Sequence, residues 1–137
     1  MKKFRNYWLP TILWAFIIFS LSALTVTPSG DFYWQDFLVK KTAHIVEYAL
    51  LFTFLYRALL NTTELSRKKA AFIALLLSGF YGLTDEYHQS FTPGREPRGR
   101  DVIIDTIGAG LAGLTIWKYL PRAPERLKSL ARVLQII

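Results

Sequence analysis

Titratable side chains that could transfer protons or bind an anion recur at helical spacing near the middle of the chain. Lys41, His44 and Tyr48 are separated by three and four residues, so they share one face of a helix. Glu47 follows His44 by three residues, and a histidine near a carboxylate is suited to general acid or base catalysis near neutral pH. We therefore take His44 and Glu47 as candidate catalytic residues. Lys41 and Tyr48 are candidate ligand-binding residues.

A second group of ionisable residues lies between positions 85 and 105. Asp85, His88 and Gln89 share one helix face, and Glu86 lies about 100° to one side of them. A further pair of aspartates, one helical turn apart, shares a face with small residues that would let another helix approach closely. Gln89 is a candidate ligand-binding residue. The candidate catalytic residues of this group are Asp85, Glu86, His88, Asp101 and Asp105.

The segment QSFTPGREPRGRD joins these two parts of the group and carries three arginines. Pro93-Gly94 is a turn signal. Guanidinium groups bind phosphate and carboxylate in two-point contacts, and the neighbouring glycines let backbone N–H groups converge on an anion. We expect an anionic ligand to be bound here by Arg95, Arg98 and Arg100.

Other chemistries have less support in the sequence. The chain has no cysteine, which excludes thiol nucleophiles, thiolate metal sites and redox switches. The pairs His44-x-x-Glu47 and Asp85-x-x-His88 resemble the spacing of metal ligands in helical bundles, but that spacing is common by chance. We therefore assign no metal ligands and no cofactor, and keep a metal-assisted site as an alternative.

Ordinary structural roles are the alternatives for the same residues. Asp101 could simply cap the N-terminus of a helix, and His44 and Glu47 could bond across helices to hold them together. The loop arginines could bind lipid headgroups without selectivity. Asp105 lies a turn too deep for capping, and its structural alternative is a salt bridge with Arg95, Arg100 or Lys41.

The elements that must position these residues are membrane helices. The chain has 137 residues, of which 52% are hydrophobic and 15% aromatic, and no charged residue occurs between Tyr7 and Gly30. About 20 apolar residues suffice to cross a bilayer. We predict an all-α, polytopic four-helix transmembrane bundle, followed by a basic amphipathic helix at the C-terminus. The predicted spans are 8–24, 42–60, 70–88 and 102–120.

The distribution of basic residues predicts the orientation of this bundle. Twelve of the 17 Lys and Arg fall on the side of the two termini and five on the other side, so the positive-inside rule places both termini in the cytoplasm. All the candidate residues then lie at the outer ends of the spans. The net charge of +7 follows mostly from this topology, and its spread over several loops argues against a nucleic-acid partner.

Three segments outside the candidate site carry their own predictions. Residues 25–39 form an outer loop with an aromatic belt of Phe32, Tyr33, Trp34 and Phe37. Residues 121–137 form a cytoplasmic amphipathic tail that lies on the inner leaflet, separate from the transmembrane domain of residues 1–120. The first span could instead be a signal peptide, with a cleavage site at Ser20-Leu21-Ser22; we expect it to be a retained span.

The segments KTAHIVEYALL (residues 41–51) and GLTDEYHQSFTPGREPRGRDVIIDTIGAGLAG (residues 82–113) closely resemble the VanZ-like family of small bacterial membrane proteins. The shared patterns are K-x-x-H-x-x-E-Y, D-E-x-H-Q-x-F-x-P-G-R and D-V-x-x-D-x-x-G. The resemblance implies a four-span protein of the bacterial cytoplasmic membrane. It also marks Pro93, Gly94 and Gly108, with the motif positions among the candidates above, as the functional set.

Two hypotheses of function follow from these observations together. The family is named after a protein associated with resistance to teicoplanin, a drug that acts on lipid-linked peptidoglycan outside the membrane. We expect the polar site to bind or act on a lipid-linked envelope component, such as a peptidoglycan precursor or a phospholipid headgroup, and so to contribute to such resistance. The alternative is an intramembrane enzyme that modifies a lipid headgroup by His/carboxylate acid–base catalysis, with or without a metal.

Overall fold

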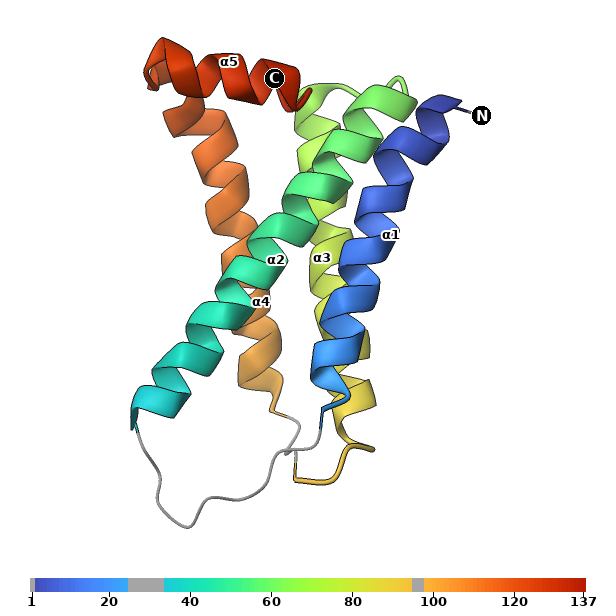
Figure 1. Cartoon of the computed structure of the whole chain (residues 1–137), viewed down its shortest axis with the longest axis vertical. Coiled ribbons are helices and arrows are strands. Elements are labelled where there is room, and N and C mark those ends of the chain that lie inside the picture. Colours follow the sequence, from blue (N-terminus) through green and yellow to red (C-terminus); the bar gives the residue numbers. More distant parts are fainter. Residues whose placement is uncertain (1, 25–33, 95–97) are drawn as a thin grey trace.

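The computed structural model describes residues 2–24, 34–94 and 98–137 of the chain, without the side chains of residues 35 and 36. Four long helices, α1 (Lys2–Ser22), α2 (Trp34–Thr62), α3 (Arg67–Gln89) and α4 (Gly99–Leu114), form a bundle (Figure 1). A π turn (η1, Thr115–Tyr119) and a 3₁₀ turn (η2, Leu120–Arg122) lead from α4 to α5 (Glu125–Val133). The described residues contain helices and no strand, which confirms the all-α prediction.

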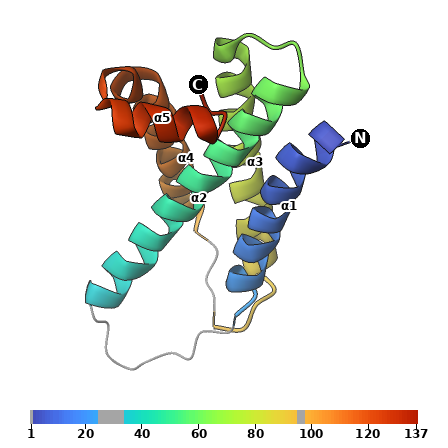
Figure 2. The ribbon, with the colours of Figure 1, turned by 45° about the horizontal axis from the view of Figure 1, so that its top comes forward.

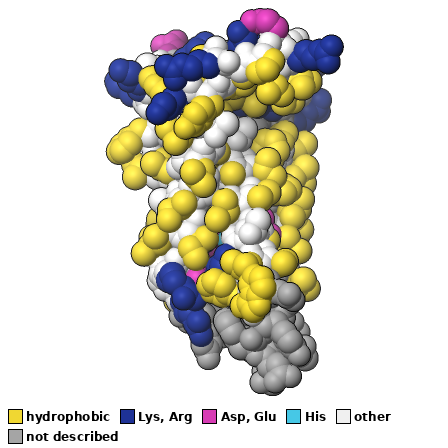
Figure 3. Space-filling model, turned by 90° about the vertical axis from the view of Figure 1, so that its left-hand side faces the viewer, with side chains coloured by type: hydrophobic (Ala, Val, Ile, Leu, Met, Phe, Trp, Pro, Cys, Tyr) yellow, Lys and Arg dark blue, Asp and Glu magenta, His cyan; other side chains and the backbone are white. Residues whose placement is uncertain are grey.

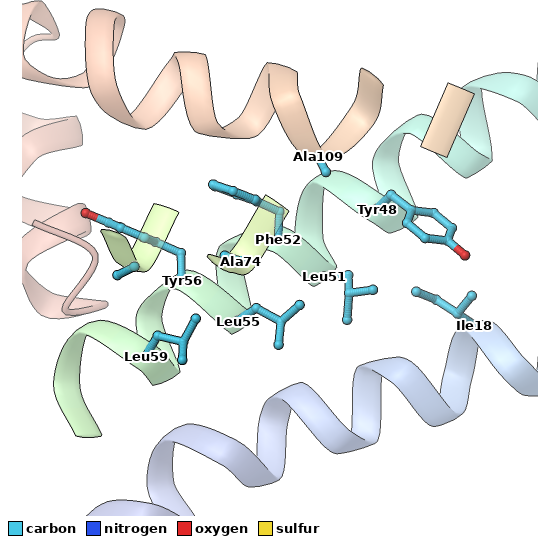
Figure 4. Packing of buried hydrophobic residues seen from close by; sticks show 10 residues of the cluster. Ile18, Tyr48, Leu51, Phe52, Leu55, Tyr56, Leu59, Ala74 and Ala109 are labelled. Atoms are coloured by element: carbon cyan, nitrogen blue, oxygen red, sulfur yellow. The ribbon is translucent and has the colours of Figure 1, made fainter. Parts of the chain in front are cut away.

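The central helix of the bundle is α2, which contacts α1, α3 and α4. Figures 1 and 2 show it crossing the bundle obliquely, with α4 on one side and α1 on the other. Buried apolar residues recur along α2 at helical spacing, so one helix supplies most of the core. Figure 4 shows this row, which comprises Tyr48, Leu51, Phe52, Leu55, Tyr56 and Leu59.

The helices α2 and α4 cross in close contact at Gly108. A Cβ atom at this position would lie 2.5 Å from the Ile45 carbonyl oxygen and 2.9 Å from the Ile45 Cα. Only glycine therefore allows the two backbones to approach this closely. The crossing brings the first turns of α4 against the first half of α2, where the ionisable residues lie.

The outside of the bundle is as apolar as its interior. Large hydrophobic side chains are exposed along all four long helices. Figure 3 shows them covering the middle of one face, while Lys and Arg side chains gather at the end that carries α5. An exposed apolar surface of this extent is typical of a surface that contacts a membrane or another protein.

One helix of the described part of the chain is both long and apolar enough to cross a membrane by itself, over Phe37–Thr62 of α2. The other three fall short for identifiable reasons. Both α1 and α3 begin with basic residues, α3 also carries Asp85 and Glu86, and α4 has 16 residues before the π turn.

The helix α2 begins at Trp34, eight residues before the predicted start of the second span, so the predicted outer loop over 25–39 is too long. The aromatic residues of this segment suggested an interfacial belt in a loop, but Trp34 and Phe37 are helical and extend α2 beyond the predicted span. Trp34 and Phe37 of the predicted aromatic belt lie at the start of α2. Phe32 and Tyr33 lie outside the described residues.

The C-terminal helix α5 lies across the end of the bundle near the N-terminus (Figures 1 and 2). Arg57 of α2 donates a hydrogen bond from Nε to the Leu134 carbonyl (2.6 Å), and Asn61 donates one to the Gln135 carbonyl (3.0 Å). The helix is amphipathic, with Leu127 and Leu130 exposed. On its polar side, the hydrogen bond from Lys128 holds the pKa of Glu125 below its usual range.

Replacing Arg57 with glutamine is expected to loosen α5. Loss of a charged donor to a backbone carbonyl costs about 0.5–1.5 kcal/mol net, which corresponds to roughly a two- to tenfold rise in local opening. Hydrogen exchange of the backbone amides of residues 125–135 measures this rise. Arg67→Gln removes the same charge from α3 and should leave the exchange unchanged; equal exchange in the two variants would contradict the docking.

Candidate functional site

The ionisable residues gather at the end of the bundle opposite to the two termini, where α1 and α3 end and α2 and α4 begin. We call them the polar cluster. Several of them are buried, including four carboxylate residues. Charged groups in so apolar a bundle are costly unless each is paired or hydrogen-bonded. The polar cluster comprises Ser22, Lys41, His44, Tyr48, Asp85, Glu86, Gln89, Asp101 and Asp105.

Two ion pairs connect α2 to α4 within this cluster. The Lys41 ammonium lies 2.6 Å from Asp101 Oδ2, and His44 Nδ1 lies 2.9 Å from Asp105 Oδ1. The two aspartates are four residues apart on α4 and their partners three apart on α2, so the pairs stack one turn above the other. The Asp105 side chain is 1% exposed, whereas those of Lys41 and His44 are 16% and 14% exposed. Each basic group is thus fixed from behind and open to the outside.

A second set of contacts connects α3 to the end of α1. Ser22 Oγ donates a hydrogen bond to Asp85 Oδ2 (2.8 Å), and Gln89 Nε2 donates another to the same oxygen (2.8 Å). All three residues are buried. The Asp85 carboxylate therefore has one oxygen fixed by two donors. Its other oxygen, Oδ1, is buried and has no hydrogen-bond partner among the described residues.

Tyr48 lies between these two sets of contacts. Its side chain is completely buried, and its hydroxyl has no hydrogen-bond partner in the described part of the chain. Figure 4 shows the hydroxyl pointing away from Phe52 and out of the apolar row. Gly82 of α3 packs against both Tyr48 and Asp105: a Cβ there would lie 3.5 Å from Tyr48 Cε1 and 3.4 Å from Asp105 Oδ2. The absence of a side chain at Gly82 lets α3 come close to the pairs of α2 and α4.

Unsatisfied polar atoms are the most unusual property of the cluster. Buried polar atoms nearly always have a hydrogen-bond partner, so an exception points to a water molecule, an ion or a ligand. Four such atoms in the described residues lack one: Tyr48 Oη, Asp85 Oδ1, His88 Nδ1 and Asp101 Oδ1. Three of them belong to the polar cluster, which therefore has donor and acceptor capacity that the chain itself does not use.

The entrance to the cluster is basic and aromatic. Glu86 accepts a hydrogen bond from the backbone N–H of Arg98, the residue that precedes α4. The Arg100 guanidinium lies 5.3 Å from the centre of the Phe37 ring and 3.7 Å from Asp101 Oδ1, and is about half exposed. The Lys41 ammonium lies 5.6 Å from the same ring. The predicted anion-binding role of Arg95 falls outside the described residues.

The structure brings together most of the predicted site residues, and it places the ring of His88 against a residue of α1. His88 stacks on Phe19 of α1, with 4.2 Å between ring centres, instead of joining His44. Glu47 lies where its backbone carbonyl accepts a hydrogen bond from Trp14 of α1 (2.9 Å). No group of three His, Asp or Glu side chains within the described ranges could hold a metal ion, so the alternative of a metal-assisted site gains no support there.

The structure differs from one of the structural alternatives and tests another in part. The residue at the N-cap of α4 is Arg98, and Asp101 lies in the first turn, where its side chain pairs with Lys41. Asp105 pairs with His44, which was not among the three cations suggested for it; one of those three, Arg95, lies outside the described residues. A histidine from another helix can approach Asp105 because α2 and α4 cross at glycine, a contact that local spacing does not reveal.

Sequence reasoning missed one residue of the cluster and one residue that packs against it. Ser22 appeared only as part of a possible cleavage site, although a serine at the polar end of an apolar helix is a natural hydrogen-bond donor to a buried carboxylate. Gly82 drew no attention, but a glycine three residues before Asp85 is a signal for close helix approach. Both lie on the helix faces that turn toward the cluster.

A comparison with models of protein families places the chain in one of them. No curated protein and no solved structure matches the chain. The family model for VanZ/LLP1 matches residues 2–121, which include all four bundle helices and the whole polar cluster. The VanZ family is membrane-associated. The chain belongs to the VanZ/LLP1 family.

Proposed function

We propose that the protein spans the bacterial cytoplasmic membrane four times, with both termini in the cytoplasm. The exposed apolar surface of the helices and the charged end near α5 support this arrangement (Figure 3). So does the excess of Lys and Arg on the side of the termini. In this orientation the polar cluster opens toward the outside of the cell.

The function that the geometry supports best is binding of the headgroup of a lipid-linked envelope component by the polar cluster. Lys41 and Arg100 lie at the entrance, where they can contact phosphate oxygens. The buried carboxylates and the Tyr48 hydroxyl lie behind them, where they can accept or donate hydrogen bonds to hydroxyl and amide groups of the same ligand. A lipid-linked peptidoglycan precursor carries both kinds of group.

The single observation that carries this proposal is the stacked pair Lys41–Asp101 and His44–Asp105. Two buried aspartates fix two basic side chains that remain partly exposed. A purely structural pair would gain from complete burial, whereas a binding site needs side chains that are held in place and still reachable. Sequestering such a precursor at the membrane surface would also alter access of teicoplanin to it, which links the site to drug resistance.

The test is lipid binding by the full-length protein in phosphatidylcholine nanodiscs. The lipid-linked peptidoglycan precursor and phosphatidylglycerol are the two probes, and native mass spectrometry measures how much of each is retained. Lys41→Gln and Arg100→Gln are each expected to lower the affinity for the precursor about five- to tenfold, because each removes one charged contact with phosphate.

Arg132→Gln is the matched control, since it removes the same charge from the exposed surface of α5. It should leave precursor binding unchanged. Equal retention of the precursor by all three variants and the unaltered protein would refute the proposal. Equal retention of precursor and phosphatidylglycerol would show that the cluster recognises phosphate without distinguishing the lipid to which it is attached.

A second candidate function is acid–base catalysis on the bound lipid, favoured by the contact of His44 with Asp105. An aspartate at Nδ1 fixes the tautomer of the ring and leaves Nε2 free to take up or release a proton. His44→Gln is then expected to lower turnover of the precursor in vesicles by on the order of 10²–10⁴-fold, while His88→Gln has little effect. Absence of turnover in the unaltered protein leaves binding as the function.

A further inference from the structure

An apolar groove lies at the other end of the bundle, between α3 and the C-terminal part of α4. Its volume is about 440 Å³, within the range of about 300–1,000 Å³ that is typical of ligand pockets. Its lining residues include Phe52 of α2, Phe72 and Leu75 of α3, and Gly110 and Gly113 of α4. At its end, towards the termini, lie Lys68 and Trp117.

The shape of the groove depends on the missing side chains of α4. A Cβ atom on Gly110 would meet no other atom within 4 Å, so the space beside it is open. A Cβ atom on Gly113 would lie 3.0 Å from Cζ of Phe52, so the ring lies directly against the backbone of α4. A slot bounded by apolar rings and bare backbone suits a flexible hydrocarbon chain.

The charged end of the groove supplies a partner for an anionic headgroup. The Lys68 ammonium lies 6.0 Å from the centre of the Trp117 ring, and both side chains are exposed. Arg67 and Lys69 are its neighbours in the first turn of α3. A tryptophan beside a cation at the end of an apolar surface is typical of the boundary between lipid tails and headgroups.

The backbone geometry at Trp117 is a second, independent observation. Residues 115–119 form a π turn, which breaks the regular α-helical ladder of α4. π turns are rare and concentrate at functional sites. This turn places Trp117 in the lining of the groove with Lys68.

We propose that this groove binds one acyl chain of an anionic phospholipid, whose phosphate contacts Lys68. The chain lies along Gly110 and Gly113 between α3 and α4, and Trp117 marks the level of the headgroup. This site is at the opposite end of the bundle from the polar cluster and does not depend on the function proposed for that cluster. The acyl chain fills the open space between α3 and α4.

The experiment uses the full-length protein in phosphatidylcholine vesicles. A rising share of the lipid is replaced with a probe that carries bromine on its acyl chains, either brominated phosphatidylglycerol or brominated phosphatidylcholine. Bromine quenches nearby tryptophan fluorescence, and the part of the quenching that Trp117→Phe removes reports on the groove. We expect the share of brominated phosphatidylglycerol that quenches half of the Trp117 fluorescence to be at least fivefold lower than the share of brominated phosphatidylcholine that does so.

Paired variants separate headgroup binding from occupation of the groove. Lys68→Gln is expected to abolish the preference for phosphatidylglycerol, and Lys69→Gln, with the same change of charge one residue away, to retain it. Gly110→Leu fills the open space and should reduce the quenching by both lipids. Ile12→Phe adds bulk to an exposed position of α1 and should not.

Three results would overturn the proposal: equal quenching by the two lipids in the unaltered protein, equal effects of Lys68→Gln and Lys69→Gln, or unchanged quenching in Gly110→Leu. Should Gly110→Leu fail to fold, Ala71→Leu fills the same groove from α3 and makes the same prediction. Binding of the peptidoglycan precursor at the polar cluster should be the same in all these variants, so the outcomes at the two sites are distinguishable.

Discussion

Gly108→Ala is expected to lower the melting temperature of the purified protein by about 5–10 °C. The added Cβ would lie 2.5 Å from the Ile45 carbonyl oxygen, and because backbone atoms cannot rotate away, α2 and α4 must separate. Overpacking of this kind costs about 1–3 kcal/mol, and the corresponding change in melting temperature is several degrees per kcal/mol for a chain of this size. Thermal unfolding in detergent, followed by circular dichroism, measures the change.

Gly110→Ala is the matched control for this prediction. It makes the same substitution two residues later on the same helix, where the new methyl group meets no atom within 4 Å. Alanine favours a helix over glycine by about 0.8–1 kcal/mol, so the melting temperature should stay the same or rise. A similar loss in both variants would show that the crossing at Ile45 does not depend on close backbone contact.

The contact of His44 with Asp105 is expected to show the strongest energetic coupling in the polar cluster. His44→Ala and Asp105→Ala should each lower the free energy of unfolding. The loss in the double variant should be smaller than the sum of the two single losses by about 1.5–3 kcal/mol. Hydrogen bonds that involve a charged group contribute about this much, and a double-mutant cycle isolates the contribution of the pair. Unfolding in detergent at a fixed lipid content supplies the four stabilities.

Lys41 and Asp101 form the comparison pair on the same two helices. Their side chains are more exposed than that of Asp105, so solvent screens the interaction and the coupling should be about 1 kcal/mol or less. A coupling below about 0.5 kcal/mol for His44 and Asp105 is within the error of additivity. It would mean that Asp105 is held by other contacts and that the pair has no special role.

Most of the bundle could be predicted from the sequence because its signals are local. The apolar stretches gave all four bundle helices, and the three- and four-residue spacings put Lys41 with His44 and Asp101 with Asp105 on common faces. The residues at which the helices begin and end were harder to predict. The start of α2 at Trp34 escaped prediction because the aromatic residues at the end of this long helix resemble an interfacial loop.

The partners of the ionisable residues could not be predicted in the same way. Which cation meets Asp105 depends on how α2 and α4 cross, and that is set by the contact of Gly108 with Ile45. The hydrogen bond from Ser22 to Asp85 depends likewise on where the end of α1 lies along α3. These are properties of helix packing between distant parts of the chain, and spacing within one helix does not determine them.

In the four-span arrangement that we propose, the stacked pairs between α2 and α4 have a consequence for how the chain enters the bilayer during synthesis. Lys41 precedes its partner by 60 residues, which takes roughly 3–12 s at a translation rate of about 5–20 residues per second. For that interval α2 carries an ammonium and an imidazole with no counter-charge from α4. The helix must therefore wait beside the insertion machinery, or with its polar end in the headgroup layer, until the fourth helix emerges and neutralises it.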